Sequence, residues 1–157
     1  MSDRLIEEWL AGRVSLGAAA QWTPEELRIV ADLAWGLAEQ RRNEEALTIF
    51  EGLAALAPST AYFQSALGAL KMRTGDIDGA LSHLDAALAS DPADIAALVN
   101  RGEIYARVGD RAAAIQNLEA AINLSSSADP PGPVTTRAKA LIRRFTEGNV
   151  DPVTKPR

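Results

Sequence analysis

Apolar and small residues recur every three to four positions along much of this 157-residue chain, the period of amphipathic α-helices. Turn residues and single prolines separate the helical segments, and runs of β-branched residues are scarce. The pattern itself repeats after 34 residues, the spacing within several pairs: Gly68 and Gly102, Gly75-Asp76 and Gly109-Asp110, Ala80 and Ala114, Leu84 and Leu118, Ala87 and Ala121, and Pro58 and Pro92. A less regular earlier copy contains Ala34, Ala46 and Phe50. We therefore predict an all-α fold built from three consecutive helix-turn-helix units.

The repeated residue types each have a packing or backbone reason. Small residues on the first helix of a unit are expected to face alanines on the second helix, because larger side chains would push the pair apart. Gly75 and Gly109 are expected to end the first helix, and the aspartates that follow them to cap the second. The large residues expected to fill the space between neighbouring units are Phe50, Leu84 and Leu118.

The segments on either side of the repeats carry their own helix signals. Thr23-Pro24-Glu25-Glu26 predicts a helix start, with Thr23 as the cap and Glu26 completing a capping box. Upstream, the spacing of one helix face is shown by Leu5, Ile6, Trp9 and Leu10; downstream, it is shown by Val134, Ala138, Leu141, Ile142 and Phe145. We expect an N-terminal helical segment at 1–22, repeats within 23–128 (about 27–60, 61–94 and 95–128), a C-terminal capping helix within 129–147, and a flexible tail at 148–157.

A 34-residue unit of two helices with this pattern resembles the tetratricopeptide repeat. The resemblance covers roughly residues 27–126 and implies a right-handed superhelical solenoid, in which the first helix of each repeat lines a concave surface. The chain departs from the family pattern at Arg41-Arg42, which replaces the Gly-Asp turn, at Arg101, where leucine is usual, and at Ser126, which replaces the closing proline.

Composition and charge narrow the range of functions. A formal net charge of −5 repels phosphate backbones, so we do not expect nucleic acid as a partner. Cysteine is absent and His83 is the only histidine, expected as a solvent-facing polar residue, which leaves no triad and no zinc site. We expect no enzyme activity, no metal and no cofactor. The chain also has no secretory signal and no apolar run near the ~20 residues that span a bilayer, so a cytoplasmic location without membrane insertion is expected.

The resemblance implies a peptide-binding groove on the first helices of the repeats. Its expected residues are Arg28, Ala31, Trp35 and Ala38 from the first repeat, Tyr62, Ser65, Ala69, Met72 and Arg73 from the second, and Val99, Asn100, Glu103 and Arg107 from the third. Trp35 is either an anchor for an apolar ligand side chain or part of the core. Arg73 and Arg107 either grip a carboxylate or backbone carbonyls of the ligand or remain solvated.

Within the family, the chain is most similar to the class II chaperones of bacterial type III secretion. The similarity includes the chain length, the three repeats between N-terminal and C-terminal helices, and the stretches Leu53–Ala57, Tyr62-Phe63 and Leu67–Ala69. It implies that the ligand is an extended segment near the N-terminus of a translocator protein. Two of the three groove aromatics of that family are alanines here, Ala31 and Ala38, which bears on the ligand motif.

Two functions therefore stand beside each other. In the first, the protein is a peptide-binding adaptor or secretion chaperone that uses the groove. In the second, it is a structural assembly subunit that acts through its convex face or through Leu5, Ile6, Trp9 and Leu10, which then dock onto a larger machine or form a homodimer. The same four residues could instead pad the first repeat.

Overall fold

A computed structural model describes residues 20–125 and 132–147, together with the single positions 4, 8, 11 and 13. These residues contain seven α-helices and no strand. The helices are α3 (Pro24–Glu39), α4 (Asn43–Leu56), α5 (Ala61–Thr74), α6 (Ile77–Ser90), α7 (Ile95–Val108), α8 (Arg111–Leu124) and α9 (Pro133–Glu147). The predicted all-α class is confirmed. None of these helices is both long and apolar enough to cross a bilayer.

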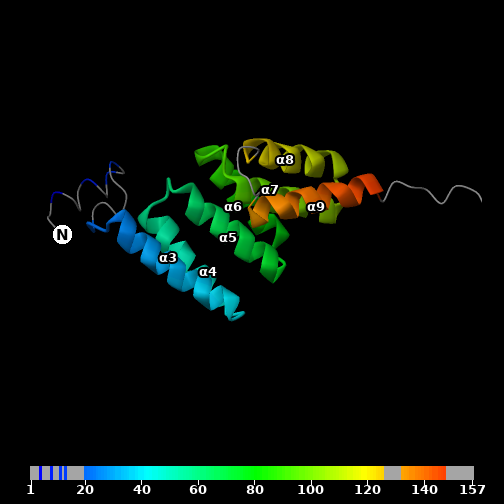
Figure 1. Ribbon diagram of the computed structural model, residues 1–157. Coiled ribbons are helices and arrows are strands. Elements are labelled where there is room, and N and C mark those ends of the chain that lie inside the picture. The colour runs from blue at the N-terminus through cyan, green and yellow to red at the C-terminus, as the bar shows by residue number, and fades with distance from the viewer. Residues whose placement is uncertain are drawn as a thin grey trace, which may run out of the picture. The chain divides into compact units, whose positions relative to one another are not determined.

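The helices form two compact units, residues 1–92 and 93–157. In the first unit, α3 packs on α4, α4 on α5 and α5 on α6, which makes two consecutive helix-turn-helix repeats (Figure 1). In the second unit, α7 and α8 form the third repeat, and α9 packs against both of them (Figure 1).

Side-chain caps start the helices where the sequence places them. Thr23 and Glu26 form the predicted capping box, in which the Glu26 amide donates to the Thr23 hydroxyl and the Thr23 amide donates to the Glu26 carboxylate. Asp76 accepts from the Gly79 amide at 2.9 Å, and Asp110 accepts from the Ala113 amide at 3.0 Å. Each cap satisfies a backbone donor that the first turn of a helix leaves without a partner.

The turn between α5 and α6 requires a left-handed residue, and the first repeat makes the same turn without glycine. Gly75 has φ +88°, and the next amide, that of Asp76, donates to the Lys71 carbonyl five residues back. In the first repeat Arg41 has φ +64°, and the Arg42 amide donates to the Leu37 carbonyl. The Arg-Arg departure from the family pattern therefore keeps the turn geometry and places a residue with a Cβ atom in a conformation that glycine adopts more readily.

The close approach of the two helices in a repeat differs in one respect from the prediction. A Cβ atom added to Gly68 would lie 2.6 Å from Leu84 Cγ and 3.2 Å from the Ala80 carbonyl oxygen. The partner of Gly68 is therefore the Leu84 side chain as well as the backbone at Ala80. Leu84 thus fills space within its own repeat.

Two glycine-to-alanine variants separate this packing constraint from helix propensity. Gly68→Ala should lower the free energy of unfolding, because overpacking costs about 1–3 kcal/mol and outweighs the gain in helix propensity. Gly52→Ala in α4 should raise it by about 0.5–1 kcal/mol, because nothing lies within 4 Å of the added methyl group. Urea unfolding of both variants measures the difference, and equal stabilities would contradict this description of the Gly68 contact.

The left-handed turn residue gives a second prediction. Arg41→Gly should raise the free energy of unfolding by about 1 kcal/mol, because glycine adopts a positive φ without the steric cost that an arginine carries. Thermal and urea unfolding check this, with Arg41→Ala as the control that removes the same side chain beyond Cβ and keeps a Cβ atom at the positive φ. A loss of stability in Arg41→Gly would show that the arginine side chain contributes more than its backbone strain costs.

Candidate functional site

Two side-chain hydrogen bonds join α3 to α5, the first helices of the first and second repeats. The Trp35 indole Nε1 donates to the Tyr62 hydroxyl oxygen at 2.8 Å. Further along the same helix pair, Arg73 Nη2 donates to the Ala38 carbonyl oxygen at 2.7 Å. Ala38 lies in the last turn of α3, and its carbonyl oxygen also accepts from the Arg41 amide at 3.0 Å. Arg73 therefore stabilises the end of α3 as well as the position of α5.

An aromatic cluster supports the first of these hydrogen bonds. Phe50 of α4 is fully buried, and its ring lies edge-on to Trp35 at 5.4 Å between ring centroids. The same ring lies 6.4 Å from Tyr62 and 6.5 Å from Phe63. These distances fall in the range of favourable aromatic pairs. Phe50 thus fills the space between the first two repeats, as predicted, and its ring packs against both Trp35 and Tyr62.

The exposure of the two aromatic residues answers the question that the sequence left open for Trp35. Tyr62 is 45% exposed, and Trp35 is half-buried against the core. Trp35 is therefore neither a core residue nor a projecting anchor: its ring packs on Phe50 while its indole nitrogen reaches the exposed Tyr62. The two side chains form one surface with an apolar body and a polar edge.

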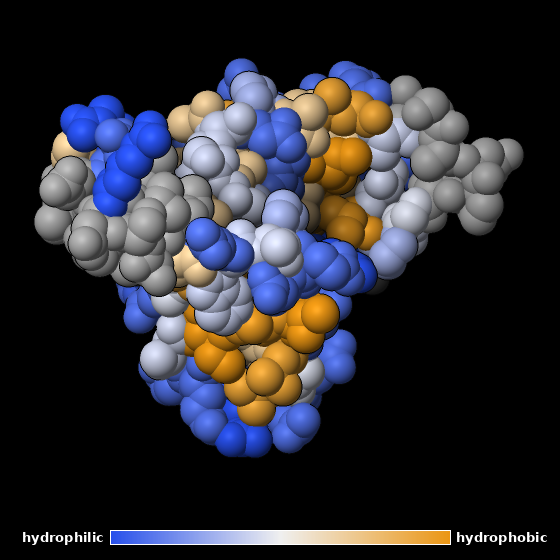
Figure 2. All heavy atoms as spheres, turned by 90° about the vertical axis from the view of Figure 1, so that its left-hand side faces the viewer, coloured by the Kyte–Doolittle hydropathy of each residue, from blue (hydrophilic) through white to orange (hydrophobic). Residues whose placement is uncertain are grey.

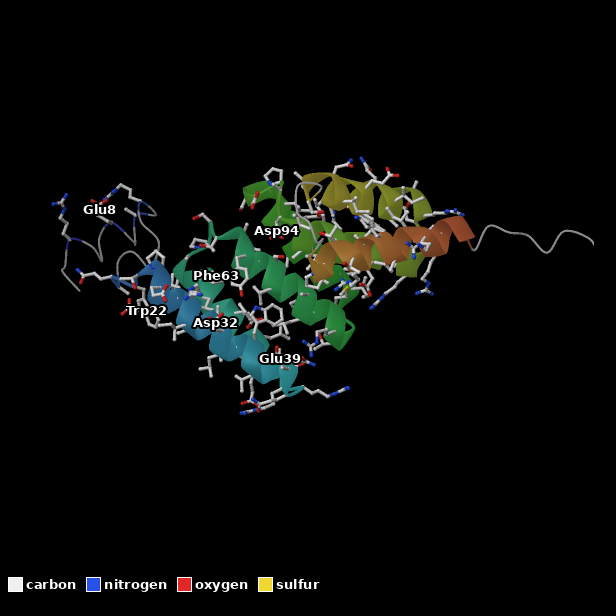
Figure 3. The ribbon with its side chains drawn as sticks, in the orientation of Figure 1. Glu8, Trp22, Asp32, Glu39, Phe63 and Asp94 are labelled. Carbon is white, nitrogen blue, oxygen red and sulfur yellow. The ribbon has the colours of Figure 1, made fainter. Side chains whose placement is uncertain are left out.

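Burial is the main influence on the Tyr62 phenol and raises its pKa. The hydrogen bond from Trp35 opposes this effect, and the negative charge of Asp32 adds to it. Asp32 projects from α3 near α5 (Figure 3). The phenol therefore stays protonated to a higher pH than an exposed tyrosine, and its hydroxyl can donate a hydrogen bond beside an acidic group.

Several residues predicted for the groove lie inside the protein. The buried ones are Ala31, Ala38, Ser65, Met72, Val99 and Asn100. Ala31 and Ala38 share one helix face with Leu27 and Ala34, and this face packs into the core. The prediction that these two residues contact a ligand directly is wrong, because neither side chain has exposed surface. The same correction applies to Val99, which is fully buried, and Ser65 and Met72 keep less than a tenth of their surface.

Three predicted groove arginines have partners within the chain. Arg28 pairs with Glu25 at 3.0 Å, and both side chains are well exposed. Arg73 is bound to the Ala38 carbonyl, so the carbonyl that it was predicted to grip belongs to this chain and not to a ligand. Arg107 pairs with Glu103 at 2.5 Å. Ala69 remains partly exposed on α5.

In the second unit, Arg137 of α9 binds Asn100 and Glu103, two residues that were predicted to line the peptide-binding groove. Its guanidinium donates to the Asn100 side-chain oxygen at 2.6 Å and pairs with Glu103 at 2.7 Å. Asn100 is only 8% exposed. The predicted role of Asn100 in binding an extended peptide is therefore replaced by an internal one, which ties α9 to α7.

The sequence model of the tetratricopeptide repeat family matches residues 31–94 and 65–133, about two thirds of the chain. The chain belongs to the tetratricopeptide repeat family. A search of the curated proteins finds no match.

Several solved tetratricopeptide-repeat structures are similar to this one. The type III secretion translocator chaperone SycD of Yersinia enterocolitica has a TM-score of 0.75 at 19% identity, covering 82% of this chain and 96% of SycD. A chain of a type III secretion complex from Aeromonas hydrophila has a TM-score of 0.76 at 19% identity, covering 95% of this chain and 100% of the Aeromonas chain. PcrH from Pseudomonas aeruginosa has a TM-score of 0.70 at 20% identity, covering 79% and 94%. At these identities the likeness shows the fold.

Two further predictions concern residues outside the tetratricopeptide-repeat groove. The proposed assembly face, formed by Leu5, Ile6, Trp9 and Leu10, lies outside the described residues. His83 was expected to face solvent; it is half-buried, and its Nδ1 lies 2.8 Å from the Gln64 side-chain oxygen. Burial, and then the positive charge of Lys71, lowers the pKa of His83.

The hydrogen bond between Trp35 and Tyr62 can be tested with a matched pair of variants, since the chain has two tyrosines. Tyr62→Phe should lower the free energy of unfolding by about 0.5–1.5 kcal/mol, because the half-buried indole N–H loses its acceptor. Tyr105→Phe is the control, since no hydrogen bond joins its hydroxyl to a described residue, and it should change stability by less than about 0.5 kcal/mol. Urea unfolding monitored by tryptophan fluorescence compares the two, and equal losses would contradict a structural role for this bond.

Proposed function

We propose that the protein is a non-enzymatic chaperone or adaptor that holds an extended segment of a partner polypeptide on the surface formed by α3 and α5. The observation that carries this proposal is the Trp35–Tyr62 pair, which presents aromatic surface and a polar edge on a preformed support. Tyrosine and tryptophan in such positions dominate the energetics of many protein interfaces, because they offer large contact area with few rotatable bonds.

The solved structures support this choice of partner. SycD is known in complex with a peptide of the translocator YopD. PcrH is known in complexes with the chaperone binding regions of PopD and of PopB. By the same logic, the partner of this chain is a translocator-like protein whose apolar segments need protection before export, and the protein acts in the bacterial cytoplasm.

The chemistry of the described residues fits a binding role. The single histidine is bonded to Gln64, and the described part of the chain holds no cluster of acidic and histidine side chains arranged for a metal. The exposed carboxylates of Glu25 and Glu45 pair with nearby arginines, and Glu26 serves the Thr23 cap. These groups have structural partners within the chain, so the proposed surface on α3 and α5 relies on aromatic and apolar contact.

A second function, assembly through another face, is favoured by exposed apolar residues on α3. Ile29 and Leu33 are 59% and 61% exposed, one helical turn apart. Leu33 lies two residues before Trp35, about 200° around the helix, so it faces away from the Trp35–Tyr62 surface. Figure 2 shows that apolar side chains do gather on the surface of the protein. This face is the matched control for the proposed site.

The test uses the full chain as bait in a soluble extract of the native host, with bound proteins identified by mass spectrometry. We expect one dominant partner with long apolar segments. Its affinity, measured with the purified partner, should fall at least about tenfold in Tyr62→Ala and remain unchanged in Leu33→Ala. Arg73 is left intact, because its loss would disturb the end of α3.

The opposite result of the two variants would favour assembly through the other face of α3. A partner that Tyr62→Ala retains and Leu33→Ala loses would assign the function to the other face of α3. Circular dichroism of both variants verifies that each remains helical, so a loss of binding is not a loss of fold.

A further inference from the structure

The second unit contains a pocket of about 430 Å³ between α7 and α9. Its residues are Glu103, Ala106 and Arg107 from α7, and Leu141, Arg144 and Phe145 from α9. The volume is in the range of small ligand sites and accommodates a large side chain with a neighbouring polar group. The pocket combines an apolar floor with a charged rim.

The end of α9 is held in place from the start of α8. The Arg111 guanidinium donates to the Phe145 carbonyl oxygen and also lies over the Phe145 ring, 5.8 Å from its centroid. A cation near the last carbonyls of a helix is favourable, and so is a guanidinium above an aromatic face. Phe145 is thus positioned before any ligand arrives, and the floor of the pocket is preformed.

The charge of the rim is positive. Both oxygens of the Glu103 carboxylate are already used, one by Arg107 at 2.5 Å and the other by Arg137 at 2.7 Å. Among the lining residues, Arg107 and Arg144 stand against Glu103, which leaves an excess of one formal positive charge. Arg137, which is not a lining residue, adds a further positive charge through its pairing with Glu103. The chain as a whole carries −5, so this rim is an exception to the charge of the protein. A positive rim in an acidic protein selects for negatively charged groups at short range.

We propose that this pocket binds an acidic segment of the partner polypeptide, with a large apolar side chain on Ala106, Leu141 and Phe145 and a neighbouring carboxylate on Arg107 and Arg144. The proposal rests on the proposed function, that the protein binds a polypeptide, and adds a second contact with its own chemistry. Arginine binds carboxylates through paired hydrogen bonds, and the apolar floor contributes by removing a side chain from water.

Other anions fit the pocket less well. Inorganic phosphate would leave the apolar floor in contact with water, and a nucleic-acid backbone would meet the overall negative charge of the protein. An acidic segment with an apolar neighbour satisfies both halves of the pocket at once. It also gives the two units of the chain different ligand requirements: aromatic and apolar contact in the first, acidic and apolar contact in the second.

The experiment is a nuclear magnetic resonance titration of the full chain, with isotope-labelled leucine methyl groups. The probes are three short peptides, capped at both ends and embedded in Gly-Ser flanks, with the centres Asp-Leu-Leu-Glu, Asn-Leu-Leu-Gln and Asp-Ser-Ser-Glu. We expect the first peptide to shift the Leu141 methyl resonances. The second peptide lacks the charge and the third lacks the apolar group, so each should bind about tenfold more weakly or worse.

Two charge-reversal variants on α9 form the matched control. Arg144→Glu should weaken the first peptide at least about tenfold, because it reverses the charge on the rim. Lys139→Glu makes the same change of charge at an exposed position on the same helix outside the pocket, and should leave the affinity within about threefold. Equal weakening by both variants, or the absence of any Leu141 shift at millimolar concentrations of the first peptide, would overturn the proposal.

The two proposals fail separately. Once the partner is known, binding that survives Arg144→Glu but is lost in Tyr62→Ala removes the pocket between α7 and α9 and keeps the proposed function. Binding that is insensitive to Tyr62→Ala removes the surface on α3 and α5, whatever the peptides do at Leu141.

Discussion

In the second and third repeats, a leucine of the second helix lies on the bare backbone of the first. Leu84 occupies the space that a Cβ atom on Gly68 would need, and Leu118 does the same at Gly102. Because both leucines are fully buried, neither can move aside for a larger residue. This contact sets how closely the two helices of a repeat approach. The positions of the side chains that project from those helices follow from it.

The first repeat solves the same problem with different residues. Its equivalent positions, one period earlier, hold Ala34 and Phe50. A ring in place of the leucine reaches beyond its own repeat, so Phe50 contacts Trp35 on one side and Tyr62 and Phe63 on the other. The first repeat thus has Phe50 in the core where the second repeat has Leu84, and this buried ring also supports the aromatic surface on α3 and α5.

Arginines have a larger structural role than their exposed appearance in the sequence indicates. Arg73 and Arg111 each donate to a carbonyl near a helix C-terminus, and Arg101, at a position where the family has leucine, donates to the Asn117 side chain at 2.8 Å. Arg137 ties α9 to α7 through Asn100 and Glu103. Backbone carbonyls at helix ends need partners, and a long planar cation can reach them from a neighbouring helix. At the pocket between α7 and α9, Glu103 balances only part of the positive charge of the arginines around it.

The repeat helices, the caps at Thr23, Asp76 and Asp110, the turns at Gly75 and Gly109 and the 34-residue period could be predicted from the sequence, because each depends on residues close together in the chain. The left-handed turn at Arg41 could not, because arginine carries no signal for a positive φ. The sequence also placed Tyr62 and Trp35 on the first helices of their repeats. Only the packing of the helices against one another shows that Trp35 bonds to Tyr62, that Ala31 and Ala38 are buried, and that Arg73 and Asn100 bond to groups within the chain. A small rotation of a helix about its axis exchanges buried and exposed faces without changing the helical pattern, so only the packed neighbours fix which face a ligand can reach.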